Sequence, residues 1–204
     1  MRQQKQTTPP IARLRQASLG AFFRPSQLSS AGLSRDQLRA MVRSGDVERI
    51  SRGLFRIADT DITENYSLAM ACARVPTSIV CLLTALRVHE IGTQMPAEIW
   101  MAIPHKAQSP RLPELRLRIV RFTGVAWTHG VTQTHFEGVP AYITSPARTV
   151  VDCFRFERLI GIEAAMEALR DALRQRKVSV AELASVDRVL PSRRLRSVLD
   201  AMLL

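Results

Sequence analysis

The apolar residues of this 204-residue chain recur with two different periods, which predict two kinds of secondary structure. Apolar positions three or four residues apart are typical of amphipathic helices, and alternating apolar positions are typical of half-buried strands. Helical patterns cover residues 10–19, 34–44, 64–74, 78–90 and 161–175, with further helices beginning near Ser145 and Ser179 and a terminal helix over 195–202. Strand patterns cover residues 47–57, 99–103, 115–119, 131–136 and 139–144. We therefore expect an α+β protein.

The predicted helix over residues 34–44 has well-defined ends. Ser34 can act as its N-cap, and Gln37, three residues later, completes a capping box. Gly45 ends the helix as the first residue beyond it. One side of the helix is apolar and should be buried. Its members are Leu38, Met41 and Val42.

A helix-turn-helix followed by a hairpin is predicted within residues 10–59. A short helix begins at Pro25, and the Ser-Ala-Gly sequence at 30–32 forms the turn before the helix over 34–44. The strand pattern at 47–57 has Arg52-Gly53 where the tip of a hairpin should be. This order of elements is that of a winged helix-turn-helix domain. Residues 1–9 are polar and end in Thr-Thr-Pro, so we expect them to be disordered.

The remaining residues, 60–204, predict an α+β domain with a small sheet and a helical C-terminus. The alternation at 115–119 changes phase at Val120 and Phe122, which suggests a β-bulge. Pro140 should keep its hairpin near a sheet edge. Ser145-Pro146 is a capped helix start with proline at the first helical position.

Arginines line the exposed edge of the helix over 34–44 and continue into the hairpin. Their spacing places a positive stripe beside the apolar side, as required of a helix that lies along DNA phosphates. The alternative is that the stripe is only a solvated surface, because basic helix faces are common. The candidate DNA-binding residues are Ser34, Arg35, Arg39, Arg43, Arg49, Arg52 and Arg56.

Charge is distributed unevenly, and this favours the DNA-binding interpretation. The net charge is +11, and residues 1–59 contain 11 Lys and Arg against 4 Asp and Glu, which is +7 of that total. A polyanionic partner should therefore bind the N-terminal part. Two loose basic groups, over 170–177 and 188–196, are either solvated helix faces or a second contact surface.

Chemistry-bearing motifs are scarce. The four histidines are scattered, and the three cysteines are far apart in apolar runs, which predicts no metal site, no cofactor and buried, reduced thiols. A metal-dependent nuclease needs Glu-x-Lys on a strand, but Trp100 stands where the lysine should follow Glu98. Phosphate-binding glycine motifs, signal peptides and membrane-spanning runs are not recognisable. We therefore expect a cytoplasmic protein that is not an enzyme.

Several segments together resemble the AbiEi family of abortive-infection antitoxins. The N-terminal resemblance lies in the recognition helix ending in glycine and the hairpin sequence Val-Glu-Arg-Ile-Ser-Arg-Gly-Leu-Phe-Arg at 47–56. The C-terminal resemblance lies in the sequences at 80–86, 93–96, 99–104 and 144–152. The likeness covers about residues 10–180, and each piece is weak alone but specific as a set.

The resemblance implies the antitoxin of a type IV toxin–antitoxin system. Such proteins bind inverted repeats in their own promoter through the winged helix and repress the operon, which implies two copies of the chain on the DNA. Their C-terminal domain counteracts a nucleotidyltransferase-like toxin, apparently without a stable complex.

On this basis Arg35 and Arg39 are expected to reach base edges, and the remaining arginines to contact phosphates. Two alternatives stay open: a stand-alone regulator whose second domain senses a ligand or dimerises, and a nuclease.

Overall fold

The computed structural model describes residues 8–17, 21–60 and 63–202. Contacts divide the chain into two compact units. Unit 1 comprises Met1–Pro76 with His135–Pro140, and unit 2 comprises Thr77–Thr134 with Ala141–Leu204. The division thus falls after residue 76, whereas we expected a boundary between 59 and 60. The expected disorder of residues 1–9 concerns mainly residues 1–7, which lie outside the described ranges.

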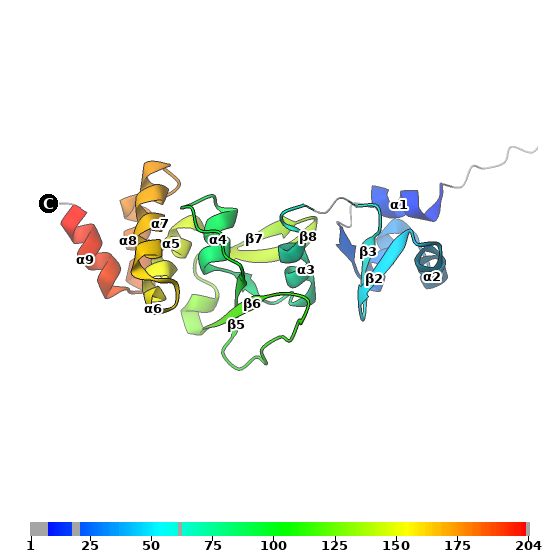
Figure 1. Ribbon diagram of the computed structural model, residues 1–204, viewed down its shortest axis with the longest axis horizontal. Coiled ribbons are helices and arrows are strands. Elements are labelled where there is room, and N and C mark those ends of the chain that lie inside the picture. Colours follow the sequence, from blue (N-terminus) through cyan, green and yellow to red (C-terminus); the bar gives the residue numbers. More distant parts are fainter. Residues whose placement is uncertain (1–7, 18–20, 61–62, 203–204) are drawn as a thin grey trace, which may run out of the picture. The chain divides into compact units, whose positions relative to one another are not determined.

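Unit 1 combines helices with a small antiparallel sheet of order β1-β3-β2 (Figure 1). Its core is formed by eight buried apolar residues contributed by every element from the first helix to the hairpin: Leu14, Phe23, Leu28, Leu33, Leu38, Met41, Val47 and Ile57. The elements are α1 (Pro10–Gln16), β1 (Phe22–Phe23), the 3₁₀ helix η1 (Pro25–Ala31), α2 (Arg35–Ser44), β2 (Val47–Ser51), β3 (Leu54–Ile57) and α3 (Tyr66–Arg74).

Local sequence signals place α2 accurately. The Ser34 side chain accepts a hydrogen bond from the backbone of Gln37, and the Gln37 side chain accepts one from the backbone of Ser34, which confirms the capping box. Gly45 ends the helix with φ of 84°, in the left-handed region that favours glycine. The predicted order of helix, turn, helix and hairpin is confirmed, although the first helix of the motif is a 3₁₀ helix.

Unit 2 is built on a mixed sheet of order β6-β5-β4-β8-β7. β4 pairs antiparallel with β5 and parallel with β8, and β5 pairs parallel with β6. The tip of the β7–β8 hairpin, His135–Pro140, belongs to unit 1 by its contacts. The strands are β4 (Ile79–Val80), β5 (Ile99–Pro104), β6 (Leu117–Phe122), β7 (Val131–Phe136) and β8 (Val139–Thr144).

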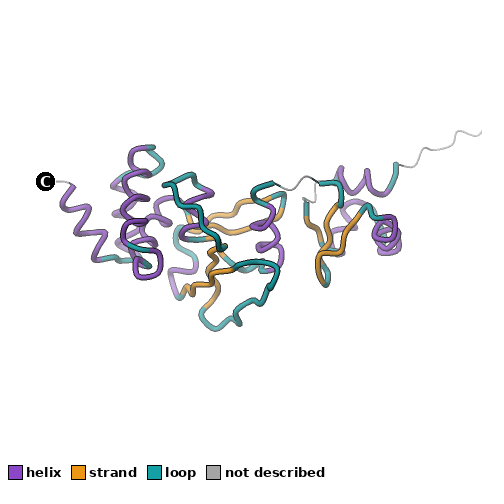
Figure 2. The backbone as a smooth tube through the Cα atoms, viewed as in Figure 1, coloured by secondary structure: helices purple, strands orange, loops and turns teal. Residues whose placement is uncertain are grey.

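The helices from α5 onward follow the sheet in sequence and form the helical C-terminus, as Figure 2 shows in purple. α5 packs against α4, α7, α8 and α9, so it is the central helix of this unit. The capping box at Ser179 and the proline start of α5 are confirmed. The helices are α4 (Leu82–Val88), η2 (Gly124–Trp127), α5 (Pro146–Arg155), α6 (Glu157–Ile160), α7 (Ile162–Arg174), α8 (Val180–Val189) and α9 (Arg193–Met202).

The prediction of one helix over residues 78–90 was partly wrong. Ile79 and Val80 form the central strand β4, and the helix begins only at Leu82. β4 is buried between β5 and β8, so its residues are apolar on both faces. A short continuous apolar run cannot be distinguished from a buried helix by periodicity alone.

The β-bulge expected near Val120 was also wrong. β6 pairs with β5 in unbroken register over all six residues, from Ile99↔Leu117 to Pro104↔Phe122. Val120 and Phe122 lie on the buried face, whereas Leu117 and Ile119 lie half-buried on the other face. Apolar residues on both faces therefore produced the apparent change of phase.

The position expected for the Pro140 hairpin, near a sheet edge, is confirmed, because its strand β7 is the terminal strand of the sheet. β8 lies inside the sheet, between β4 and β7. β4 is so short, however, that it pairs only with Tyr142 and Ile143. Pro140 lies beyond this pairing, so its missing N–H interrupts no hydrogen bond to β4.

Candidate nucleic-acid interface

The exposed side of α2 carries three of the predicted arginines. Arg35, Arg39 and Arg43 are all exposed, whereas Leu38 and Met41 are 5% and 4% exposed. The helix therefore packs by its apolar side and leaves the arginine stripe accessible, which is the arrangement that the spacing predicted.

A hollow of about 510 Å³ lies between α2 and the β2–β3 hairpin. Four arginines line it, three from α2 and Arg49 from β2, which is the cross-strand neighbour of Phe55. The structure thus brings together residues from separate elements on one concave, basic surface. The complete lining is Pro25, Arg35, Leu38, Arg39, Val42, Arg43, Arg49 and Phe55.

Acidic side chains neutralise little of this surface. Arg39 Nη1 lies 2.8 Å from Asp36 Oδ1. Within the described residues, Arg35, Arg43 and Arg49 form no ion pair with a carboxylate. Three guanidinium groups are consequently free to bind an external anion.

Arg52 occupies the tip of the hairpin, as predicted, and its side chain is exposed. Ser51 and Leu54 pair across the turn, and Gly53 has φ of 73°, which a residue with a side chain rarely adopts. The turn therefore requires glycine after Arg52 and projects the arginine from the end of the strand pair.

Ser34 is exposed at the N-terminus of α2. Its Oγ accepts the capping hydrogen bond from Gln37, 3.2 Å away, so only its hydroxyl hydrogen is available for another partner. Ser34 can thus donate to a phosphate without breaking its cap.

Arg56 does not belong to this surface, and the prediction that it contacts phosphate was wrong. Its side chain is buried, with the residue only 6% exposed. The guanidinium donates to Glu48 at 3.4 Å and to the Thr60 carbonyl, and lies over the Tyr66 ring, 5.1 Å from its centroid. Arg56 therefore interacts within unit 1, on the face of β3 opposite to that of Phe55 and Ile57, which pack in the core.

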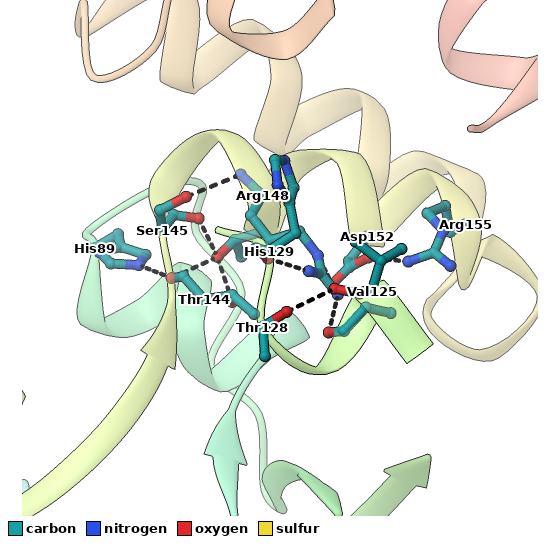
Figure 3. A network of polar contacts seen from close by, with 11 residues as sticks. His89, Val125, Thr128, His129, Thr144, Ser145, Arg148, Asp152 and Arg155 are labelled. Carbon is teal, nitrogen blue, oxygen red and sulfur yellow. Dashed lines mark hydrogen bonds and ion pairs between the residues drawn. The ribbon is translucent and has the colours of Figure 1, made fainter. Parts of the chain in front are cut away.

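A second arrangement of polar groups, in unit 2, was not predicted as a unit. Arg148 on α5 is completely buried, and Asp152, one turn later, is buried with it. Arg148 Nε donates to Asp152 Oδ2 at 2.7 Å, and Arg155 Nη1 donates to the other carboxylate oxygen at 2.6 Å (Figure 3). The one available signal was an Arg and an Asp four residues apart in an otherwise apolar helix.

Both terminal nitrogens of Arg148 donate to backbone carbonyls. The acceptors are those of Ala126, at 3.1 Å, and His129 (Figure 3). The guanidinium also lies over the Phe122 ring, 4.9 Å from its centroid. These partners tie α5 to η2 and to the segment before β7. Because each polar group is occupied, the network is suited to positioning elements rather than to binding an external ligand.

Neighbouring polar contacts fix the start of α5. The Thr144 carbonyl accepts hydrogen bonds from Thr149 Oγ1 at 3.1 Å and from His89 Nε2 at 2.7 Å. Burial lowers the pKa of His89 below its usual value, and the Lys177 ammonium lowers it further, while the Thr144 carbonyl opposes both. His89 is accordingly a neutral donor that connects the end of α4 to β8.

The three cysteines, Cys72, Cys81 and Cys153, are buried and form no disulfide. Burial raises the pKa of Cys72 to about 12 and also raises those of Cys81 and Cys153. Thiols of this kind are poor nucleophiles.

In the part of the chain that the structure describes, no three His, Cys, Asp or Glu side chains are grouped to hold a metal ion. Nor do the described helices include one with the length and apolar character needed to cross a membrane.

Comparison with known proteins supports the assignment of unit 1. Residues 11–58 match the family described as transcriptional regulator, AbiEi antitoxin. This match covers α1 to β3, which includes the whole basic surface. No curated protein matches the chain.

One solved structure is similar in fold. The crystal structure of the RV2827C protein from Mycobacterium tuberculosis is similar with a TM-score of 0.50 and 16% sequence identity. The similarity covers 91% of this chain and 73% of that one. At this identity the likeness concerns the fold, which spans both units.

Proposed function

Because residues 11–58 are the N-terminal domain of an AbiEi antitoxin transcriptional regulator, we propose that the protein represses its own operon by binding double-stranded promoter DNA. The observation that carries this proposal is the hollow between α2 and the hairpin, which four arginines line. Within the described residues, only Arg39 among these four forms an ion pair, with Asp36. A concave cationic surface complements the phosphate backbone of a duplex.

In this proposal α2 lies in a major groove. Arg35 and Arg39, near the start of its exposed side, contact base edges, where the arginine fork can bind guanine through two hydrogen bonds. Phosphates are contacted by groups that position the protein but do not specify sequence. These are Ser34, Arg43, Arg49 and Arg52.

We propose that two copies bind an inverted repeat. Each copy supplies one recognition helix, so a symmetric operator provides two equivalent half-sites. Three exposed phosphate-binding arginines per copy should give a slope of log K against log salt of roughly −3 for each bound copy.

The second part of the proposal is that unit 2 counteracts a nucleotidyltransferase-like toxin without catalysing a reaction itself. This role comes from the AbiEi resemblance. The network around Arg148 fits a structural role within this unit, because it holds α5 against η2 and the segment before β7.

Fluorescence anisotropy tests the DNA-binding part. The full chain is titrated with a duplex of its own upstream DNA and with a scrambled duplex, each over a series of salt concentrations. We expect tight, steeply salt-dependent binding that favours the upstream sequence and is lost in the Arg35→Ala/Arg39→Ala variant. Equal and weak binding to both duplexes would overturn the proposal.

Growth rescue tests the toxin part. Cells expressing a nucleotidyltransferase-like toxin, encoded beside this chain where such a gene is present, should grow again when the full chain is co-expressed from an unrelated promoter. The Arg35→Ala/Arg39→Ala variant should rescue equally well, because its unit 2 is unchanged. If a well-expressed wild-type chain does not restore growth, the toxin part of the proposal is wrong.

A further inference from the structure

Asp36 is the one carboxylate that contacts an arginine of the basic surface in the described residues. It lies in the first turn of α2, and Arg39 follows three residues later on the same side. The Asp36 Oδ1 to Arg39 Nη1 distance is 2.8 Å, and both side chains are exposed, at 84% and 71%. The pair therefore sits at the surface that is proposed to face DNA.

A carboxylate at this position opposes DNA binding. Phosphates repel it, so it weakens binding to every duplex regardless of sequence. It also occupies the guanidinium of Arg39, which would otherwise be free to pair with any phosphate within reach. An exposed ion pair contributes little to stability, so stability alone gives a weak reason for it.

We propose that Asp36 is a positioning residue that makes Arg39 selective for a base edge over the phosphate backbone. This inference rests on the proposed function, since it concerns how the same surface discriminates between sequences. Asp36 occupies Nη1 of the Arg39 guanidinium, and the exposed side chain keeps its Nε and Nη2 donors accessible. Contact with a base edge through two of these donors can be made while the ion pair persists, whereas flexible pairing with a phosphate competes with it.

The inference predicts a specific change in the Asp36→Asn variant. Arg39 becomes free to neutralise one more phosphate, so binding to the scrambled duplex should tighten and its salt slope should steepen by about 0.9 for each bound copy. Discrimination between upstream and scrambled DNA should fall by about fivefold or more, the lower end of what one base contact contributes.

Two further variants separate positioning from charge and stability. Asp36→Glu keeps the carboxylate and can still reach Arg39, so it should restore most of the discrimination. Asp59→Asn removes an equal charge from the same unit and breaks a similar exposed pair, Asp59 with Arg15 at 3.0 Å, which lies outside the basic surface. Its discrimination should equal that of the wild type.

A double-mutant cycle gives the decisive result. In an Arg39→Ala background, Asp36→Asn should no longer change discrimination, because the group that Asp36 positions is absent. If Asp36→Asn lowers discrimination equally with and without Arg39, or if it leaves the salt slope and the discrimination of the wild-type background unchanged, the inference is wrong. Failure of the proposed function is distinguishable, since the wild-type chain itself would then bind both duplexes equally.

Discussion

Arginine occupies two opposite environments in the two units of this protein. On α2 and β2 of unit 1, the Arg35, Arg43 and Arg49 side chains are exposed and form no ion pair within the described residues. On α5 of unit 2, Arg148 is completely buried, with a carboxylate, two carbonyls and an aromatic ring as partners. The same side chain is thus exposed at these positions of unit 1 and connects buried elements in unit 2.

Saturation of donors explains the difference. A guanidinium has five N–H donors and keeps its charge, so burial is tolerated only when hydrogen bonds and a counter-charge replace water. Arg148 has these partners and is completely buried. Within the described residues, Arg35, Arg43 and Arg49 of unit 1 have no carboxylate partner, and a polyanion can provide the counter-charge. Four experiments test this distinction, given from the largest expected effect to the smallest.

Removal of Arg148 should have the largest effect. Arg148→Ala leaves the buried Asp152 carboxylate without its main counter-charge and two buried carbonyls without a donor, which should lower the free energy of unfolding by about 3–5 kcal/mol. Urea denaturation followed by circular dichroism measures the loss. Arg155→Ala is the matched control: this side chain is 25% exposed and Asp152 keeps Arg148, so we expect a loss of about 1 kcal/mol or less. Equal losses in both variants would show that Arg148 holds no special position.

Arg39→Ala should instead affect binding and leave stability almost unchanged. We expect affinity for upstream DNA to fall by about 1–3 kcal/mol, with relaxed specificity at one base pair, because a base contact is lost. Anisotropy titrations with single base-pair substitutions measure both quantities. An equal fall in affinity for upstream and scrambled duplexes would mean that Arg39 contacts only the backbone.

Arg52 and Arg56 form a natural pair for separating exposed from buried arginine within one hairpin. Arg52→Ala should reduce the salt slope by about 0.9 for each bound copy, on upstream and scrambled DNA alike. Arg56→Met should leave the slope unchanged and lower thermal stability, because Arg56 interacts with Glu48 and Tyr66 inside the unit. A smaller salt slope in Arg56→Met would show that Arg56 does contact a DNA phosphate.

His89 should give the smallest effect, visible as a dependence of stability on pH. Its folded pKa is lowered, mainly by burial, so the unfolded chain binds the proton more readily. The contribution of neutral His89 to the free energy of unfolding is complete above the unfolded pKa of about 6.5. It is lost as pH falls through that value toward the folded pKa. From about pH 7.5 to 5.5, the wild type should therefore lose more stability than His89→Gln. Carboxylates titrate in both proteins and cancel in the difference, so parallel curves would contradict the assignment.

Sequence patterns predicted most of the elements because many of their signals are local. The capping residues of α2, its apolar side and its arginine stripe all lie within twelve residues of one another along the chain, from Ser34 to Gly45. Each acts through one or two helical turns, so spacing alone reveals it. The α+β class, the β7–β8 hairpin and the capped starts of α5 and α8 follow for the same reason.

Tertiary structure decided the features that depend on distant partners. β4 is a strand because β5 and β8 pair on its two sides, and the apolar run at Ile79–Val80 contains no information about them. Arg56 is an internal residue and Arg52 an external one, although both are arginines of the same predicted hairpin. Arg148 finds its carbonyl partners 22 and 19 residues earlier in the chain.

The sequence by itself thus determined the type and order of most helices and strands, and where positive charge accumulates. Only the folded chain decided which arginines remain available to a partner, because availability depends on burial and on acceptors brought from elsewhere. Local hydrogen bonding and periodicity are properties of a short segment, whereas desolvation and saturation of donors are properties of the packed structure.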